Sequence, residues 1–397
     1  MLTSIAMILL LGLLAGRIFS KLKLPSLLGM ILVGIVLSPH ALNLIDDSIL
    51  AISGELRRIA LVIILTRAGL SLDVSDLRKV GRPAVLMCFV PACIEMLGTV
   101  ILAPMLLGVS ILEAAIMGSV IAAVSPAVVV PRMLRLMEEG YGKNKSIPQL
   151  ILAGASVDDV FVIVVFTAVT ALASTGAMAT LSFMQIPISI VLGIIFGSCV
   201  GIILAAFFKK WHMRDSVKIL IILSISFLLL EAESRLQEYI PFSGLLAIMS
   251  MGIIIKQKYD VLAVRLATKY NKLWLGAEVF LFVLVGATVD LKYVMAAGTE
   301  AVVLILCALL FRMAGVALSL LKTDLSAKER LFCMVAYTPK ATVQAAIGAI
   351  PLSMGLECGN VVLTVAVLSI LITAPFGAIC VDNLYKRLLE QSNDIDI

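Results

Sequence analysis

The chain has 397 residues, of which 61% are hydrophobic and only 14% are charged, and its mean hydropathy is +1.12. This composition excludes a soluble enzyme, a nucleic-acid-binding protein and a disordered chain, because apolar stretches of about 20 residues recur along nearly the whole sequence. The net charge of +5 is therefore a signal of membrane topology. We expect one all-α polytopic membrane domain over residues 1–397.

Thirteen transmembrane helices are predicted when the chain is divided at charged residues and at glycine or proline breaks. They cover residues 1–19, 24–39, 51–73, 83–107, 110–136, 148–173, 184–208, 216–235, 240–256, 270–290, 297–322, 329–352 and 358–383. The first segment has no basic region at its start and is followed by further apolar segments. We therefore expect it to be a membrane helix and not a cleaved signal peptide.

The basic residues of the predicted connections predict the orientation of the chain. Taken alternately, one set of connections, with the C-terminal tail, holds 24 Lys and Arg residues, whereas the other set holds only Arg235 and Lys292. Basic loops of membrane proteins remain on the cytoplasmic side. The sequence thus predicts a multi-pass protein of the cell (inner) membrane, with an extracytoplasmic N-terminus and a cytoplasmic C-terminus.

The fifth and twelfth segments each carry a proline near the middle of the membrane. Ser125 precedes Pro126 in the fifth and Thr338 precedes Pro339 in the twelfth, and in both segments a valine stands four residues after the proline. Proline removes a backbone donor and disfavours helix in the preceding residue, so both helices should be interrupted there. The two segments are seven helices apart, and because this number is odd they cross the membrane in opposite directions. Inverted repeats with broken helices are typical of secondary transporters.

The sixth segment places two adjacent carboxylates, Asp158 and Asp159, near the centre of the bilayer. A charged side chain at this depth is costly and is usually retained to handle ions or protons. Adjacent helical residues point about 100° apart, so Asp158 and Asp159 cannot face one partner equally and we expect them to have different roles. Ser156, on the Asp159 face, and Ser125 at the first break offer further oxygens, which hard cations prefer.

Three more charges lie at similar depth. Glu95 in the fourth segment and Arg312 in the eleventh are seven helices apart, so they are placed to pair across the axis of the inverted repeat. A purely structural ion pair and a gating pair are both consistent with this position. Lys340 follows the second break and, with Thr338, is expected to neutralise the ends of the facing half-helices.

Four segments give the chain a specific resemblance to the cation/proton antiporters, and within them to the NHA branch, solute carrier family 9 subfamily B. They are residues 56–70, 154–160, 280–287 and 339–348, the last of which begins Pro-Lys-Ala-Thr-Val-Gln. By this resemblance Asp159 is the essential cation and proton carboxylate, Asp158 is its neighbour, Lys340 is the crossing-helix lysine, and Glu95 and Arg312 form an ion pair. Many bacterial relatives have lysine where Arg312 stands, which leaves the charge stoichiometry open.

The resemblance also implies an architecture with a sodium/proton antiporter fold and elevator-like transport. The ion-translocating core would consist of helices 83–173 and 297–383, and the dimerising scaffold of helices 1–73 and 216–290, with a linker helix at 184–208. The implied partners are membrane lipid, monovalent cations and a second copy of the chain.

We therefore expect a secondary transporter and not an enzyme, one that exchanges Na⁺ or Li⁺ for H⁺ by competition at Asp159. Potassium/proton exchange is the alternative, because the same carboxylate chemistry serves it. An intramembrane aspartyl protease is a remote alternative, since Asp158 and Asp159 are neighbours on one helix and that chemistry needs aspartates from two helices. A passive cation channel is equally remote. The sequence has no phosphate-binding loop, and we expect no cofactor, with the ions as substrates.

Overall fold

The computed structural model describes residues 1–72, 81–175, 180–236, 242–289 and 298–391, with all their side chains except those of residues 156 and 174–187. Throughout these residues the regular structure is helical, apart from an isolated β-bridge between Tyr141 and Gln391. The helices up to the sixth predicted segment are α1 (Leu2–Lys21), α2 (Ser26–Leu37), α3 (Asp47–Ala51), α4 (Ser53–Ser71), α6 (Arg82–Met87), α7 (Val90–Leu107), α8 (Ile111–Ile121), α9 (Pro126–Glu138), η1 (Lys143–Lys145) and α10 (Ile147–Thr175). The later helices are α11 (Thr180–Lys210), α12 (Asp215–Leu236), α13 (Gly244–Lys258), α14 (Asp260–Ala287), α16 (Gly298–Ser319), α17 (Ala327–Ala336), α18 (Thr342–Ile347), α19 (Ile350–Ser353) and α20 (Gly359–Leu388).

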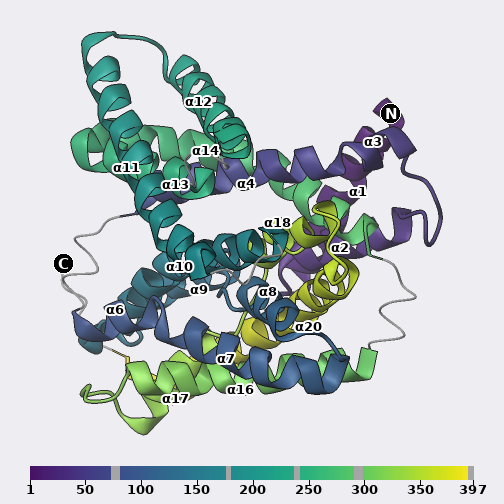
Figure 1. Ribbon diagram of the computed structural model, residues 1–397. Coiled ribbons are helices and arrows are strands. Elements are labelled where there is room, and N and C mark those ends of the chain that lie inside the picture. The colour runs from purple at the N-terminus through teal and green to yellow at the C-terminus, as the bar shows by residue number, and fades with distance from the viewer. Residues whose placement is uncertain (73–80, 176–179, 237–241, 290–297, 392–397) are drawn as a thin grey trace. The chain divides into compact units, whose positions relative to one another are not determined.

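All thirteen predicted segments are helical over most of their described length (Figure 1). Among the described residues, eight helical stretches are long and apolar enough to cross a membrane, and two shorter apolar helices accompany them at Ser26–Leu37 and Thr342–Ser353. The prediction of an all-α polytopic membrane protein is confirmed.

The predicted start of the tenth segment, residue 270, is wrong. α14 begins at Asp260, ten residues earlier than expected, so Arg265 and Lys269 lie on a helix and not in a loop. α13 ends at Lys258, and no glycine or proline stands between 260 and 269 to delay the start of the next helix. Buried Leu262, Leu266 and Tyr270 recur every four residues and give the first turns an apolar face to pack.

The fourth predicted segment is two helices, α6 and α7, and not one. The chain turns at Cys88 and Phe89 before α7 begins at Val90. Pro91 occupies the first turn of α7, where its missing N–H costs least. That proline cannot donate to the carbonyl of Met87, four residues earlier, so the helix is interrupted at this point.

The chain divides into two compact units, which are described separately. The first unit contains Met1–Gly54, Ser75–Phe166 and Leu281–Ile397, and the second contains Glu55–Val74 and Thr167–Phe280. Residues 1–54 thus cluster with the helices predicted to form the core. Which helices move during transport stays a prediction.

Both interrupted helices lie in the first unit and begin with the same motif. Ser110 and Glu113 form a capping box at the start of α8, and Ser326 and Glu329 form one at the start of α17. In each box the serine hydroxyl accepts from the glutamate N–H, and the glutamate carboxylate accepts from the serine N–H. The repeated motif shows that the two inverted halves correspond at their helix starts as well as at their breaks.

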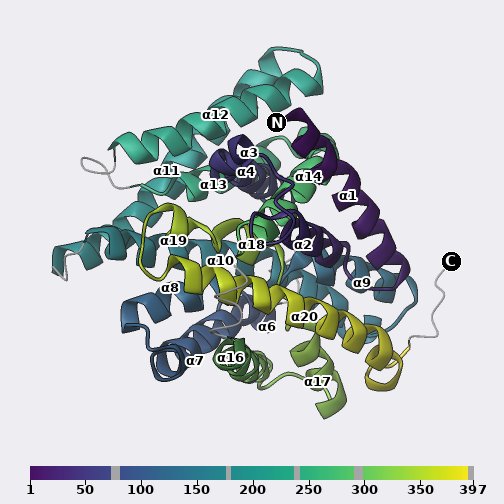
Figure 2. The same ribbon diagram turned by 90° about the vertical axis from the view of Figure 1, so that its right-hand side faces the viewer.

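The breaks themselves lie where the prolines predict them. α8 ends at Ile121 and α9 begins at Pro126, whereas α17 ends at Ala336 and α18 begins at Thr342, with Pro339 between them. The two flanking helices of the inverted halves, α7 and α16, run side by side in the first unit (Figures 1 and 2). The predicted inverted repeat with two broken helices is confirmed.

In the second unit α11 and α13 pack closely through a glycine, which gives a test of packing. A Cβ atom added at Gly197 of α11 would overlap the Ala247 carbonyl group of α13. We expect Gly197→Ala to lower stability by about 1–3 kcal/mol, because the two backbones would have to separate. The thermal unfolding midpoint in detergent measures this. Gly276→Ala is the control, since its Cβ would meet nothing within 4 Å, and an equal loss in both variants would contradict the prediction.

Candidate functional site

The two interrupted helices meet at their breaks. Residues 122–125 join α8 to α9, and residues 337–341 join α17 to α18. The Ser125 N–H donates to the Pro339 carbonyl at 2.7 Å. Backbone groups that a continuous helix would pair internally are thus paired across the crossing, as the interior of a membrane requires.

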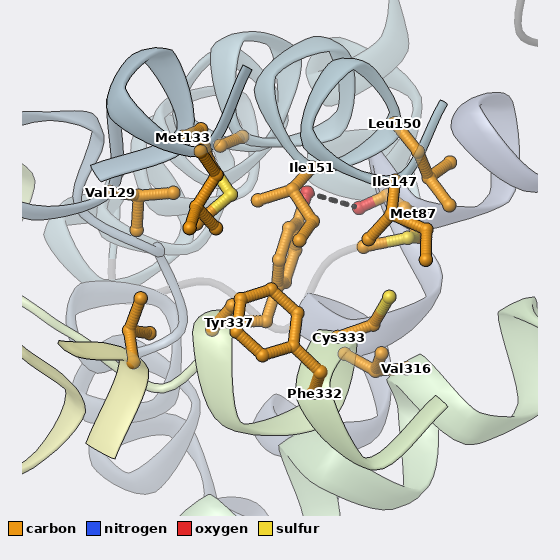
Figure 3. Close-up of a cluster of buried hydrophobic side chains, with 14 of the residues drawn as sticks. Met87, Val129, Met133, Ile147, Leu150, Ile151, Val316, Phe332, Cys333 and Tyr337 are labelled. Carbon is orange, nitrogen blue, oxygen red and sulfur yellow. Dashed lines mark hydrogen bonds between the residues drawn. The ribbon is translucent and has the colours of Figure 1, made fainter. Parts of the chain in front are cut away.

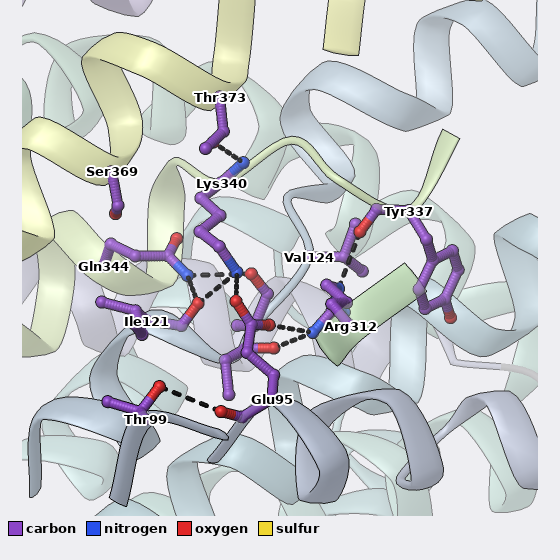
Figure 4. Close-up of polar contacts among 12 residues, drawn as sticks. Glu95, Thr99, Ile121, Val124, Arg312, Tyr337, Lys340, Gln344, Ser369 and Thr373 are labelled. Atoms are coloured by element: carbon purple, nitrogen blue, oxygen red, sulfur yellow. Dashed lines mark hydrogen bonds and ion pairs between the residues drawn. The ribbon is translucent and has the colours of Figure 1, made fainter. Parts of the chain in front are cut away.

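Arg312 of α16 is fully buried and lies against both breaks (Figure 4). Its Nη1 is 2.9 Å from Glu95 Oε2, and its Nη2 is 2.9 Å from Asp158 Oδ2. Nε donates to the Tyr337 carbonyl at 2.7 Å, and Nη1 also donates to the Ala122 carbonyl. One guanidinium therefore binds two carboxylates and one carbonyl from each break, which the planar set of five donors allows.

Lys340 is fully buried beside the same glutamate. Its Nζ lies 2.6 Å from Glu95 Oε1 and also donates to the Ile121 carbonyl, at the C-terminal end of α8. Its backbone N–H donates to the Thr373 hydroxyl of α20 at 2.9 Å. Glu95 thus has a cation on each of its two carboxylate oxygens, and the ammonium lies where the dipole of α8 is negative.

The two aspartates of α10 differ in their surroundings. Asp158 is fully buried, and its Oδ2 accepts from Arg312 and, at 2.7 Å, from the Val124 N–H of the first break. Asp159 is partly exposed. Asp158 Oδ1, Asp159 Oδ1 and the hydroxyl of Ser125 are among the buried oxygens that have no hydrogen-bond partner among the described side chains, as is the Thr342 hydroxyl after the second break. Unpaired buried oxygens are costly unless a ligand completes them, so the first three are candidates for cation ligands.

Thr338, predicted with Lys340 to compensate the half-helix ends, is bonded within its own segment. The Thr338 hydroxyl donates its proton to the Val335 carbonyl, three residues earlier, at 2.8 Å. The side chain of Ser156 lies outside the described residues.

The ionisable groups at the crossing do not balance. The site holds three carboxylates and two cations, which are Glu95, Asp158, Asp159, Arg312 and Lys340. With all five ionised, the centre carries one excess negative charge. A cation with oxygen ligands, or a proton, would neutralise it.

Comparison with known proteins identifies the family. The model of a family described as "Sodium/hydrogen exchanger, transmembrane" matches residues 5–384 of the chain. Sodium/hydrogen exchanger 9B2 of Mus musculus is 35% identical over 399 residues, which cover 95% of this chain and 72% of that relative. The chain belongs to the sodium/hydrogen exchanger family. Sodium/hydrogen exchanger 9B1 of Homo sapiens is 32% identical over 391 residues, which cover 94% of the chain and 74% of the relative.

The exchanger family fold is also shown by a solved structure. The sodium proton antiporter MjNhaP1 from Methanocaldococcus jannaschii, at pH 8, is similar with a TM-score of 0.85 over 98% of both chains, at 22% sequence identity. A second structure of that antiporter gives a TM-score of 0.76. Members of this family are transporters, so the chain is a transporter and not an enzyme.

Groups of four residues that hold this exchanger site together were not predicted from the sequence. They are the backbone N–H of Val124, the carbonyl and ring of Tyr337, the hydroxyl of Thr373 and the side chain of Gln344. The Gln344 amide donates to the Ala123 carbonyl at 2.8 Å, and its Oε1 accepts from the Ala341 N–H. A polar side chain within an apolar segment is the signal that could have found Gln344, whereas the other three depend on the path of the backbone.

Proposed function

We propose that the chain exchanges Na⁺ or Li⁺ for H⁺ across the membrane, with both ions competing at the Asp158–Asp159 pair. The observation that carries this proposal is the set of three unpaired buried oxygens, two of them carboxylate oxygens, beside a crossing of broken helices in a sodium/hydrogen exchanger family member. Oxygen ligands with an excess negative charge suit a small monovalent cation.

Competition at one carboxylate would couple the two ions without further machinery. Asp158 Oδ2 is already bound by Arg312 and Val124, whereas Asp159 Oδ1 has no partner among the described side chains, so Asp159 is the group that gains or loses a proton or a cation. In a site of low dielectric constant this carboxylate binds one of them at a time, and each ion lowers the affinity for the other by the same factor.

The contacts at the crossing support an elevator-like movement. Arg312 and Lys340 connect helices α7, α8, α10, α16, α17 and α20 through hydrogen bonds and ion pairs, so these helices should travel as one rigid body. The site would then face either side of the membrane in turn, while the scaffold helices stay in place.

Ion exchange by the purified protein in proteoliposomes tests the function. With an acidic interior, addition of Na⁺ or Li⁺ outside should dissipate the pH gradient, which a pH-sensitive dye reports. Potassium at the same concentration should leave the gradient in place. Exchange with potassium alone would replace this proposal by the potassium/proton alternative, and equal movement of all three cations without proton flux would indicate a channel.

The orientation of the chain in the membrane follows from its basic loops. We expect position 41, between α2 and α3, to be extracytoplasmic and position 328, at the start of α17, to be cytoplasmic. In a variant without the seven native cysteines, a membrane-impermeant maleimide applied to intact cells should label Ala41→Cys and not Lys328→Cys. Labelling of both positions from outside would contradict the topology.

A homodimer through the scaffold helices 1–73 and 216–290 is the remaining part of the proposal. Because the ion site lies on other helices, Asp159→Asn should leave the dimer intact. Mass measurement of both proteins in lipid nanodiscs checks this. A wild-type chain that is monomeric there and exchanges at full rate would contradict the dimer.

A further inference from the structure

Arg312 is held on two sides by a single residue, Tyr337, at the end of α17. The Arg312 Nε donates to the Tyr337 carbonyl at 2.7 Å, and the guanidinium carbon lies 5.2 Å from the centre of the Tyr337 ring. Both side chains are fully buried. A planar cation over an aromatic face is attracted to it, most strongly where water is absent. Backbone and ring together therefore restrict the rotation of the guanidinium.

The ring of Tyr337 is itself fixed from its far end (Figure 3). Its hydroxyl donates to the carbonyl of Met87 at 3.3 Å, at the last residue of α6. The residue four positions later is Pro91, which has no N–H to offer that carbonyl. The tyrosine thus satisfies a buried acceptor that the proline leaves unpaired, and movement of the ring would leave both groups unpaired.

Gly154 of α10 gives the phenol its space. A Cβ atom at this position would overlap the Tyr337 hydroxyl and lie 3.0 Å from the Met87 Cβ. Gly154 is four residues before Asp158, so the two lie on one face of the helix. The face of α10 that carries Asp158 therefore packs directly against the tyrosine that holds the partner of Asp158.

We propose that Tyr337 is a positioning residue for ion binding, which keeps Arg312 on one oxygen of Asp158 and leaves the other oxygen for the cation. Arg312 contacts Oδ2 through Nη2, while Oδ1 has no partner among the described side chains. Arginine and carboxylate pair readily through two parallel hydrogen bonds. Without the ring the guanidinium would keep only the backbone carbonyl of residue 337 on this side, and it could turn to take both oxygens of Asp158, so that the cation would lose a ligand. This inference rests on the proposed sodium/proton exchange.

Sodium-dependent exchange in proteoliposomes tests the proposal. It gives the sodium concentration for half-maximal exchange and the maximal rate as two separate quantities. Tyr337→Leu removes the ring and the hydroxyl, and it should raise the sodium concentration for half-maximal exchange about tenfold with the maximal rate within about twofold. Phe332→Leu is the matched control, because Phe332 is a buried aromatic residue of the same cluster (Figure 3) and, among the described side chains, its ring makes no contact with a cation. It should lower the unfolding midpoint and leave the sodium affinity unchanged.

A second pair of variants separates the hydroxyl from the ring and remains informative if Tyr337→Leu fails to fold. Tyr337→Phe keeps the ring beneath Arg312, so its sodium affinity should stay within about threefold while the unpaired Met87 carbonyl lowers the unfolding midpoint. Gly154→Ala should weaken sodium binding in the wild type and much less in Tyr337→Phe, where the nearest tyrosine atom is a ring carbon 3.3 Å away.

Two results would overturn the assignment. Unchanged sodium affinity in Tyr337→Leu with a lowered unfolding midpoint would make Tyr337 a packing residue only, and so would identical effects of Gly154→Ala in both backgrounds. Absence of exchange in the wild type measured alongside would instead overturn the proposed function, and this inference with it.

Discussion

Replacement of Asp159 by asparagine is expected to abolish both exchange and the stabilisation of the protein by sodium. Asparagine keeps the shape of the side chain but can neither release a proton nor neutralise a cation. At a sodium concentration about 100 times its dissociation constant, the wild type should gain roughly 2.7 kcal/mol of stability, because a ligand stabilises the state that binds it. Asp159→Asn should gain none. Proton flux in proteoliposomes and unfolding midpoints with and without sodium measure the two effects.

The matched control is Asp158→Asn, which changes the neighbouring residue by the same atoms. Its Oδ2 is engaged by Arg312 and the Val124 N–H, so we expect lower stability without sodium and weakened, not abolished, exchange. In the wild type the apparent sodium affinity should improve as the pH rises from 6 to 9, since protons then compete less. A sodium affinity independent of pH, or full activity of Asp159→Asn, would remove the competition mechanism.

The second large effect is expected from the loss of Arg312. Arg312→Ala would leave Glu95 with one cation instead of two, Asp158 with none, and two backbone carbonyls without their donor. Removal of one partner from a buried ion pair typically costs about 3–5 kcal/mol, because an uncompensated charge remains. We expect a loss of this size, measured as a lower unfolding midpoint without sodium, together with loss of exchange.

Lys340→Met is the comparison that makes this prediction specific. Glu95 would keep its contact with Arg312, and both breaks would keep their arginine, so the stability loss should be clearly smaller. Arg312→Lys should fall between the two, since an ammonium has the charge but not the planar set of five donors. Equal midpoints for Arg312→Ala and Lys340→Met would show that the two cations serve the site equally and would contradict the assignment.

The sequence alone predicted the parts of the fold that depend on single residue types. Pro126 and Pro339 fix the breaks because a missing N–H has the same consequence in any membrane helix. The capping boxes at Ser110 and Ser326 are not among the predictions, although a serine three residues before a glutamate is a known signal of a helix start. The start of α14 differs from the prediction because Arg265 and Lys269 were assigned to a loop, although no glycine or proline stands between 260 and 269.

The site was only partly predictable, for a different reason. Opposite charges at equivalent depth suffice to expect Glu95 near Arg312, and the structure places them 2.9 Å apart. The sequence does not say which of several acceptors a guanidinium will bind, because the choice depends on where the broken backbones cross. The carbonyls of Ala122 and Tyr337 became ligands of Arg312 through that crossing, and no pattern of residue types marks a carbonyl.

The buried carboxylates of the crossing lie in the first inverted half of the chain and the buried cations lie in the second. This order affects the synthesis of the chain. Glu95 and Asp158 are synthesised long before Arg312, which follows Asp158 by 154 residues. At about 5–20 residues per second, Asp158 waits roughly 8–30 s for its partner. A carboxylate is costly in the hydrocarbon of a bilayer. The nascent first half therefore has to remain sheltered from lipid until the eleventh helix is inserted, and a chain truncated before residue 312 should be a substrate for membrane quality control.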